Sequence, residues 1–86
     1  MPKLMATHEV DDVAHWLASP KREEVFAGVA SDIRTFVDPS RPNHVGLTMD
    51  VADMAAFQAV MDSQAGAEAM KHDGVRPETI AVFVEA

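Results

Sequence analysis

The chain has 86 residues, and hydrophobic residues make up 48% of it, which is typical of a globular domain and too high for a disordered segment. Fourteen acidic residues against seven basic ones give a net charge of −7, which disfavours binding to nucleic acid phosphates and to anionic membrane surfaces. The sequence has no cysteine, which excludes a disulfide, a thiol nucleophile and a thiolate metal site.

One soluble domain over residues 1–86 is the organisation that these limits predict. The first residues lack the apolar core of a secretory signal, and no apolar run approaches the ~20 residues of a membrane span. We therefore expect a cytoplasmic protein with neither nucleic acid nor membranes among its partners. A chain this short buries only about 60–65% of its unfolded surface, so self-association would add to its stability.

The first half of the chain predicts a strand, a helix and a second strand, over residues 3–10, 13–27 and 33–37. The strands are indicated by alternation of apolar and polar side chains. Asp12 is placed to cap the helix, because its carboxylate can accept a hydrogen bond from a free backbone N–H. Ser19-Pro20 interrupts or restarts the helix, and Gly28 is expected to end it as a left-handed C-cap.

The second half repeats this order, with elements over residues 45–51, 54–73 and 80–84 after a turn-rich loop. Asp53 is the expected cap of its helix, Gly74 the expected end, and Ser63 to Gly66 a candidate break.

Each predicted helix presents one apolar face to the sheet. In the first helix this face carries Val13, Trp16 and Leu17 at its start. In the second helix it includes Phe57 and Met61. We expect these faces to form the core with the sheet.

Two segments of the chain resemble each other without a gap. T-H-E-V-D-D-V-A-H-W-L-A, from Thr7, and T-M-D-V-A-D-M-A-A-F-Q-A, from Thr48, share the pattern T-x-[ED]-V-x-D-[VM]-A-x-[WF]-x-A. The chain therefore contains two similar β-α-β halves. The order β-α-β-β-α-β predicts the α+β class and a ferredoxin-like fold, a four-stranded antiparallel sheet with two helices on one face and the first and third strands in its centre.

The two faces of this sheet differ in character. The face expected under the helices is almost entirely apolar and includes the edge-strand residues Val37, Val82 and Val84. The other face is mixed, and its apolar side chains are Met5, Phe36 and Phe83. Because water would otherwise contact them, we expect a second copy of the chain to cover this face in a homodimer. A monomer that tolerates a few exposed aromatic side chains is the alternative.

Four short motifs mark the ends of these elements: V-x-D-x-x-x-W from Val10, P-N-x-V from Pro42, D-x-x-x-F from Asp53, and a Gly-Val at each helix end. In this layout the chain resembles the dimeric α+β barrel proteins, and among them small bacterial proteins described as cyclase-like or antibiotic-biosynthesis-monooxygenase-like. The resemblance implies a homodimer whose sheets face each other and a ligand cleft between each sheet and its helices. Some such proteins oxidise aromatic polyketides without a cofactor, and others cleave haem. The haem-cleaving members carry an asparagine on the first strand where this chain offers His8, which argues against haem degradation.

His8 is the candidate catalytic residue. It lies on the helix-facing side of its strand, where the second half has Met49. The side chains expected around it, as ligand-binding residues, are Trp16, Phe26, Phe57 and Met61. An apolar, aromatic cleft with one titratable group is the usual form of a small-molecule site, and a histidine there is suited to act as a general base near neutral pH. The alternative is a hydrogen-bonded histidine of the core.

A metal site is not expected from the other histidines. His15 lies opposite the apolar face of its helix, so its imidazole should point away from His8. Neither helix has the H-x-x-x-H or E-x-x-H spacing, and the chain has no G-x-S-x-G or glycine-rich phosphate motif. We therefore expect neither a metal nor a cofactor.

The sequence leaves two functions open. The first is a homodimeric barrel protein that binds a small apolar or aromatic molecule, with cyclase-like or cofactor-free monooxygenase-like chemistry and His8 as the base. The second is a non-catalytic dimerisation or ligand-carrier module with a filled core. A cavity beside His8 that is large enough for a ring system would favour the first.

Overall fold

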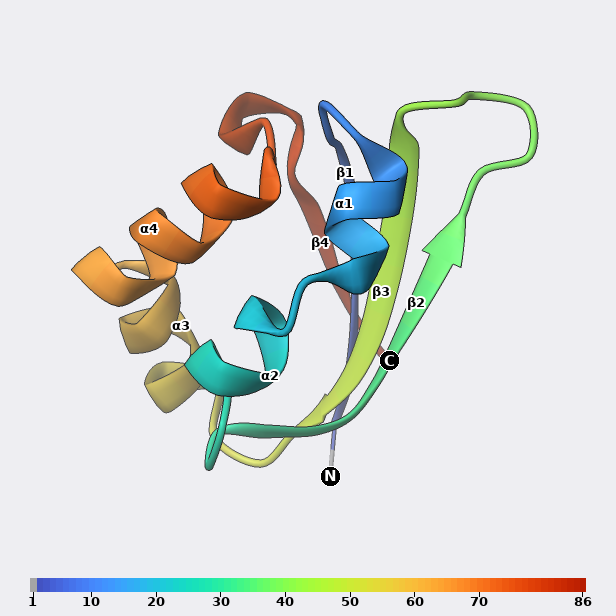
Figure 1. Ribbon diagram of the computed structural model, residues 1–86. Coiled ribbons are helices and arrows are strands. Elements are labelled where there is room, and N and C mark those ends of the chain that lie inside the picture. The colour runs from blue at the N-terminus through green and yellow to red at the C-terminus, as the bar shows by residue number, and fades with distance from the viewer. Residues whose placement is uncertain (1) are drawn as a thin grey trace.

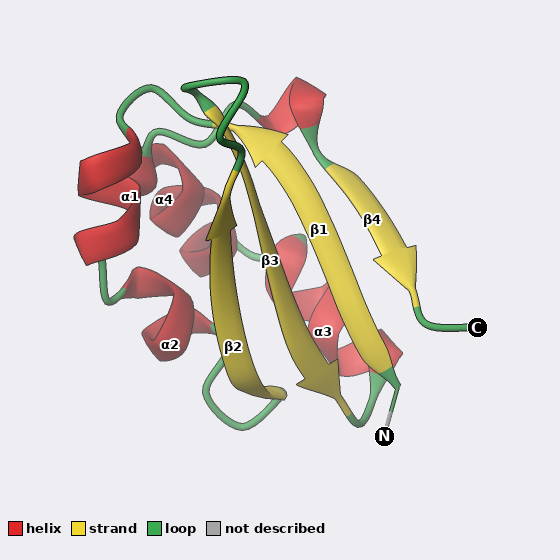
Figure 2. Cartoon of the chain, turned by 90° about the vertical axis from the view of Figure 1, so that its right-hand side faces the viewer, coloured by secondary structure: helices red, strands yellow, loops and turns green. Residues whose placement is uncertain are grey.

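The structure, a computed structural model, describes residues 2–86, which form a four-stranded antiparallel sheet with helices on one face (Figure 1). The strands are β1 (Lys3–Glu9), β2 (Ala30–Val37), β3 (His44–Val51) and β4 (Ala81–Val84). Their order across the sheet is β2-β3-β1-β4, so the first and third strands are central, as Figure 2 shows from the open face. The predicted α+β class and ferredoxin-like arrangement are confirmed.

Each of the two predicted helices is divided into two shorter ones. The elements are α1 (Val13–Ala18), α2 (Lys21–Val25), α3 (Met54–Met61), α4 (Gln64–Asp73) and a short 3-10 helix, η1 (Pro77–Thr79). The first break lies at Ser19-Pro20, as expected, and the second at Ser63, whose Oγ accepts a hydrogen bond from the N–H of Gly66 at 3.1 Å. No helix within residues 2–86 is long and apolar enough to cross a membrane.

The helix ends follow the predicted caps in three of four places. The carboxylates of Asp12 and Asp53 accept backbone N–H groups at 3.1 Å and 2.9 Å, which satisfies donors that the first helical turn leaves free. Gly74 ends α4 in the left-handed conformation, with φ at 71°. The expected helix end at Gly28 is wrong, because α2 ends at Val25 and the positive φ of Gly28 serves the turn into β2.

The core lies between the helices and the two central strands. Its members are Leu4, Ala6, Val10, Val45, Leu47, Met49 and Val51 from the β1 and β3 segments, with Trp16 and Phe57 from the helices.

Two expectations about burial are wrong. Leu17 is 45% exposed, because α1 has only six residues and directs Trp16 alone deep into the core. The three valines Val37, Val82 and Val84 are 47–52% exposed although their strand partners are buried, because they lie on edge strands that the helices cover incompletely.

The open face of the sheet carries an apolar patch formed by Met5, Phe36 and Phe83, which are 43%, 53% and 53% exposed. Met5 and Phe83 are direct cross-strand partners. The predicted exposure of these three side chains in a single chain is therefore confirmed.

Candidate functional site

An apolar cleft lies between the sheet and the helices, with a volume of about 80 Å³. Strands β1, β3 and β4 supply its floor, and α1 to α4 supply its walls. His8, Trp16, Phe26, Phe57 and Met61 all line it. The structure thus brings together every side chain that the sequence nominated for the site. Their roles in binding and catalysis stay predictions.

The aromatic side chains of the cleft belong to different elements that the two halves of the chain bring together. Trp16 of α1 is 1% exposed, and Phe57 of α3 is 5% exposed. Phe26, at the end of α2, stacks on Phe57 with ring centroids 5.2 Å apart and planes at 18°. This stack joins the first helix pair to the second and forms one wall of the cleft.

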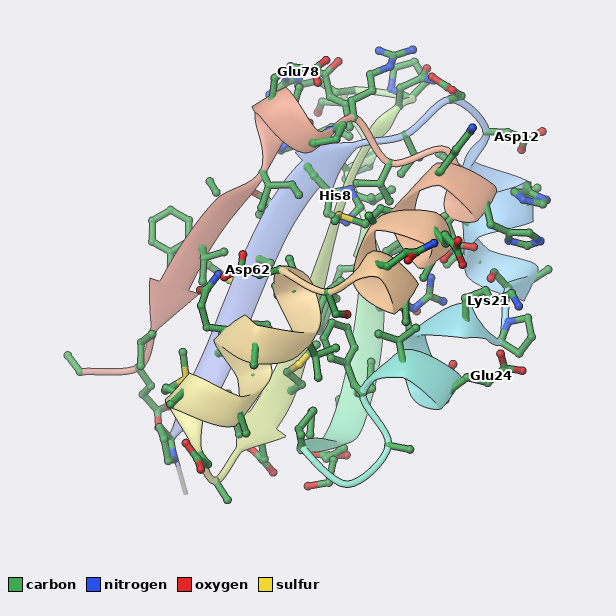
Figure 3. The ribbon with its side chains drawn as sticks, turned by 90° about the vertical axis from the view of Figure 1, so that its left-hand side faces the viewer. His8, Asp12, Lys21, Glu24, Asp62 and Glu78 are labelled. Atoms are coloured by element: carbon green, nitrogen blue, oxygen red, sulfur yellow. The ribbon has the colours of Figure 1, made fainter. Side chains whose placement is uncertain are left out.

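His8 occupies a buried position on β1, where its strand partner is Val45. The imidazole meets the Trp16 indole edge-to-face, with centroids 5.5 Å apart and planes at 79°. Figure 3 shows His8 between β1 and the helices, whereas the labelled Asp12 and Glu24 lie at the outer surface. The period of the strand explains this position, since residues two apart share a face and His8 follows the buried Leu4 and Ala6.

The surroundings of His8 favour the neutral form of its imidazole. Burial lowers the pKa of His8 below its ordinary value of 6.5, and the positive charge of Arg22 lowers this pKa further. Opposing them, the Glu9 carbonyl oxygen lies 3.5 Å from Nδ1, a long contact that raises the pKa. If Nδ1 carries the proton toward that carbonyl, Nε2 holds a free lone pair, because no residue within 2–86 hydrogen-bonds to it. A neutral imidazole of this kind can accept a proton from a ligand.

Three charged side chains also line the cleft, Lys21, Arg22 and Asp73, and sequence reasoning missed the two that are buried, Arg22 and Asp73. Arg22 of α2 is 7% exposed and Asp73 of α4 is 3% exposed. In the first helix pair, Arg22 precedes Val25 by three residues and Phe26 by four. In α4, Asp73 follows Met70 by three residues. Residues three or four apart share a helix face, so each charged side chain lies on a face with apolar neighbours. The place of each residue on an apolar helix face is a signal that could have identified it as buried, but not that the two residues approach each other.

The size of the cleft limits what it can hold at rest. About 80 Å³ is roughly half the ~150 Å³ of an apolar cavity that binds benzene. Met61 and Met70 line the space, and unbranched methionine side chains move more easily than branched ones. An aromatic ring therefore enters only if such side chains are displaced.

Three potential metal ligands gather between α1 and α4, and Asp73 is the one of the three that also lines the cleft. His15 of α1 lies beside His72 and Asp73 of α4, with their ligand atoms within 4.8 Å of one another. We call this group the interhelix cluster. His15 Nε2 hydrogen-bonds the His72 carbonyl oxygen at 2.8 Å, and His72 Nδ1 bonds the Asp73 carboxylate at 2.9 Å. Spacing within one helix does not reveal a group assembled from two helices. The expectation that no metal binds stays a prediction.

Comparison with solved structures identifies proteins that share this fold. No family model and no curated protein matches the chain. Among solved structures, a Bordetella bronchiseptica protein described as a candidate antibiotic biosynthesis monooxygenase has a TM-score of 0.74 at 16% identity, covering 99% of this chain and 94% of its own. The chain has the fold of the antibiotic biosynthesis monooxygenases. SnoaB, a cofactor-independent oxygenase from Streptomyces nogalater, has a TM-score of 0.72 at 11% identity, with 99% and 90% covered.

A protein described as belonging to another family shares the fold. An ethyl tert-butyl ether D family protein from Bacillus halodurans has a TM-score of 0.62 at 17% identity, covering 100% of this chain and 97% of its own. Identities this low establish the shared ferredoxin-like α+β architecture alone. The resemblance to this group of proteins is thus confirmed at the level of the fold.

Proposed function

We propose that the protein binds a compact aromatic molecule in the cleft and that His8 removes a proton from it. The observation that carries this proposal is a buried imidazole, its pKa lowered by that burial, in a cleft whose lining is mostly apolar and aromatic. A general base needs a free lone pair and a pKa near or below the working pH, and His8 meets both conditions. Trp16 and the Phe26–Phe57 stack supply ring surfaces for the ligand.

The chemistry that follows proton removal is cofactor-free oxygenation or a cyclisation. His8 Nε2 accepts a proton from an activated C–H group, and the electron pair remains on the substrate as an enolate. If that group is a methylene, reaction with O2 converts it to a carbonyl and releases water, so the substrate supplies all the electrons. The fold shared with SnoaB, described as a cofactor-independent oxygenase, supports this branch.

Deuterium exchange tests the proton transfer directly. 2-Indanone is a compact aromatic ketone whose activated C–H bonds exchange with D2O when a base removes their protons, and NMR follows the loss of the proton signal. We expect the wild-type protein to accelerate this exchange and His8→Met to reduce the acceleration about 10²–10⁴-fold. His15→Met is the matched control, because His15 is an exposed histidine outside the cleft. Equal exchange rates for wild type and His8→Met would refute the role of His8, and oxygen uptake distinguishes oxygenation from cyclisation.

We further propose that two copies of the chain pack through their open sheet faces. The patch of Met5, Phe36 and Phe83 is the support, together with the thin core that 86 residues can build. Sedimentation at micromolar concentration should give the mass of a dimer, and Phe36→Asp should shift the protein to the monomer. A wild-type protein that sediments only as a monomer would contradict this proposal.

A non-catalytic carrier is the second candidate, and the small volume of the cleft favours it. A cleft of about 80 Å³ is close to a filled core. A carrier would bind ligands with little dependence on His8 and would leave the 2-indanone exchange rate at its level in buffer.

A further inference from the structure

Arg22 is a buried cation with spare hydrogen-bond donors. Its guanidinium carbon lies 4.4 Å from the centre of the Trp16 ring, and its Nη1 donates to the Trp16 carbonyl oxygen at 2.8 Å. Within residues 2–86 this is the one hydrogen bond that the guanidinium makes, and Nε is buried without any partner. A guanidinium has five N–H donors, and in Arg22 the Nε–H is buried without a protein acceptor, so capacity for a further acceptor remains.

The nearest carboxylate does not use this capacity. Asp73 Oδ2 lies 4.0 Å from Arg22 Nη1, well beyond the 2.7–2.9 Å that is typical of a charge-assisted hydrogen bond. The other oxygen of Asp73 accepts a hydrogen bond from His72 at 2.9 Å. A purely structural ion pair would be expected to close its hydrogen bonds, because an unsatisfied buried charge is destabilising. This pair remains open.

Arg22 and the candidate base share the cleft and one aromatic neighbour. Arg22 and His8 both line the cleft, and both contact the indole of Trp16. The remaining charged groups of the lining are Lys21 and Asp73. The rest of the lining is apolar. A ligand whose ring fills the apolar part therefore presents its polar end to Arg22 and His8.

We propose that Arg22 is the specificity-determining residue of the cleft and that it accepts aromatic ligands with an acidic oxygen, those of the phenol or enol class. The inference rests on the proposed function, since the cleft must admit a ligand. An oxygen that reaches the guanidinium fills a vacant acceptor position and gains a charge-assisted hydrogen bond. The positive guanidinium also stabilises the negative charge of the enolate that forms when His8 takes a proton. A hydrocarbon of the same shape leaves the donors unsatisfied.

Two probes of similar shape test the inference. 4-Nitrophenol carries an acidic oxygen, and 4-nitrotoluene has a methyl group in its place. Isothermal titration calorimetry at pH 8 should show that the wild-type protein binds 4-nitrophenol at least about tenfold more tightly, the worth of one charge-assisted hydrogen bond. Near the pKa of free 4-nitrophenol, the bound probe should show more of the visible absorption of its anion. In 15N-resolved NMR, the Nε–H signal of Arg22 should shift on binding.

Variants assign the preference to Arg22. Arg22→Met keeps an apolar stem but leaves Asp73 as a buried charge, so Arg22→Met/Asp73→Asn is the variant of choice and removes both charges together. It should lower the affinity for 4-nitrophenol about tenfold and change that for 4-nitrotoluene less than threefold. Arg41→Met, at an exposed arginine in the β2–β3 loop, should change neither.

The outcomes separate this inference from the proposed function. If the wild-type protein binds both probes equally, or if the double variant keeps the preference, the role of Arg22 is overturned while the cleft stands as a ligand site. If neither probe binds to the wild-type protein, the cleft itself is overturned and the inference with it. Should the double variant fail to fold, the wild-type preference and the Arg22 Nε–H shift still decide, because equal binding or an unmoved signal contradicts the inference.

Discussion

Replacement of His8 by methionine separates a structural histidine from a functional one. The variant places in the first half the side chain that Met49 already contributes, 1% exposed, in the second half. The edge-to-face pair with Trp16 is worth about 0.5–1.5 kcal/mol, and a methionine–indole contact returns about 0.3–1.5 kcal/mol. The contact of Nδ1 with the Glu9 carbonyl is 3.5 Å long, so its loss costs at most about 1 kcal/mol. We therefore expect His8→Met to change the free energy of unfolding by less than about 1.5 kcal/mol at pH 7.5.

The same variant should change how stability depends on pH. Burial lowers the pKa of His8 in the folded protein below the value of 6.5 that it has when unfolded. Between these two pKa values the unfolded chain binds more protons, so wild-type stability falls as the pH drops from 6.5 through the folded pKa and then levels off. His8→Met lacks this contribution. Relative to wild type, the variant should therefore be more stable at pH 5 than at pH 7.5, by about 1.4 kcal/mol for each unit of pKa difference.

Urea unfolding followed by circular dichroism at the two pH values measures both effects, and His15→Met controls for a histidine at the surface. A loss of more than about 3 kcal/mol at pH 7.5 would show that His8 is a structural residue with strong native contacts. A stability difference between wild type and variant that is the same at both pH values would show that burial does not lower the pKa of His8. Either result would remove the ground for regarding it as a poised base.

Further predictions concern the burial of individual side chains, the close approach at Gly66 and metal binding. Phe57→Ala should lower the free energy of unfolding, measured in urea, by about 3–5 kcal/mol. Leu17→Ala, at a 45% exposed position, should lower it by less than about 0.5 kcal/mol. Similar losses for the two variants would contradict the assigned burial. Gly66→Ala should cost about 1–3 kcal/mol, because the new Cβ would meet the backbone carbonyl of Val60, which cannot rotate away; an unchanged urea midpoint would refute this close approach. EDTA should leave the melting temperature unchanged, since the groups of the interhelix cluster bond to one another, and a shift of several degrees that zinc reverses would overturn this expectation.

Sequence patterns over a few residues predicted the central strands and the starts of two helices. Alternation placed β1 and β3, and aspartate caps placed the starts of α1 and α3, because each depends on residues only a few positions apart. The same alternation led to an error at Val82, which faces the helices yet is 47% exposed. Which face a side chain takes is a property of its strand. How far the helices reach over an edge strand depends on helix length and packing, which the strand sequence does not contain.

The aromatic lining of the cleft was predictable from the sequence, and its buried charged residues were not. His8 and its aromatic neighbours follow from the strand and helix periods. The approach of Arg22 to Asp73 joins α2 to α4 across about fifty residues, and no spacing rule covers such a distance. The sequence also did not predict the volume of the cleft, because that volume depends on how the methionine side chains pack.

The two similar halves of the chain explain why His8 is the informative residue. Asp12 and Asp53 cap equivalent helices, and both aromatic residues four positions after them, Trp16 and Phe57, are buried in the core. The halves differ at the position on the preceding strand, where the second has a methionine and the first has His8. Since the second half is built without a polar group there, the fold does not require an imidazole. A buried titratable side chain disfavours its own charged form, as the lowered pKa of His8 shows, so the histidine adds a liability that an apolar residue would avoid. The fold alone therefore does not account for His8, whereas the proposed role as a base in the cleft that it shares with Arg22 does.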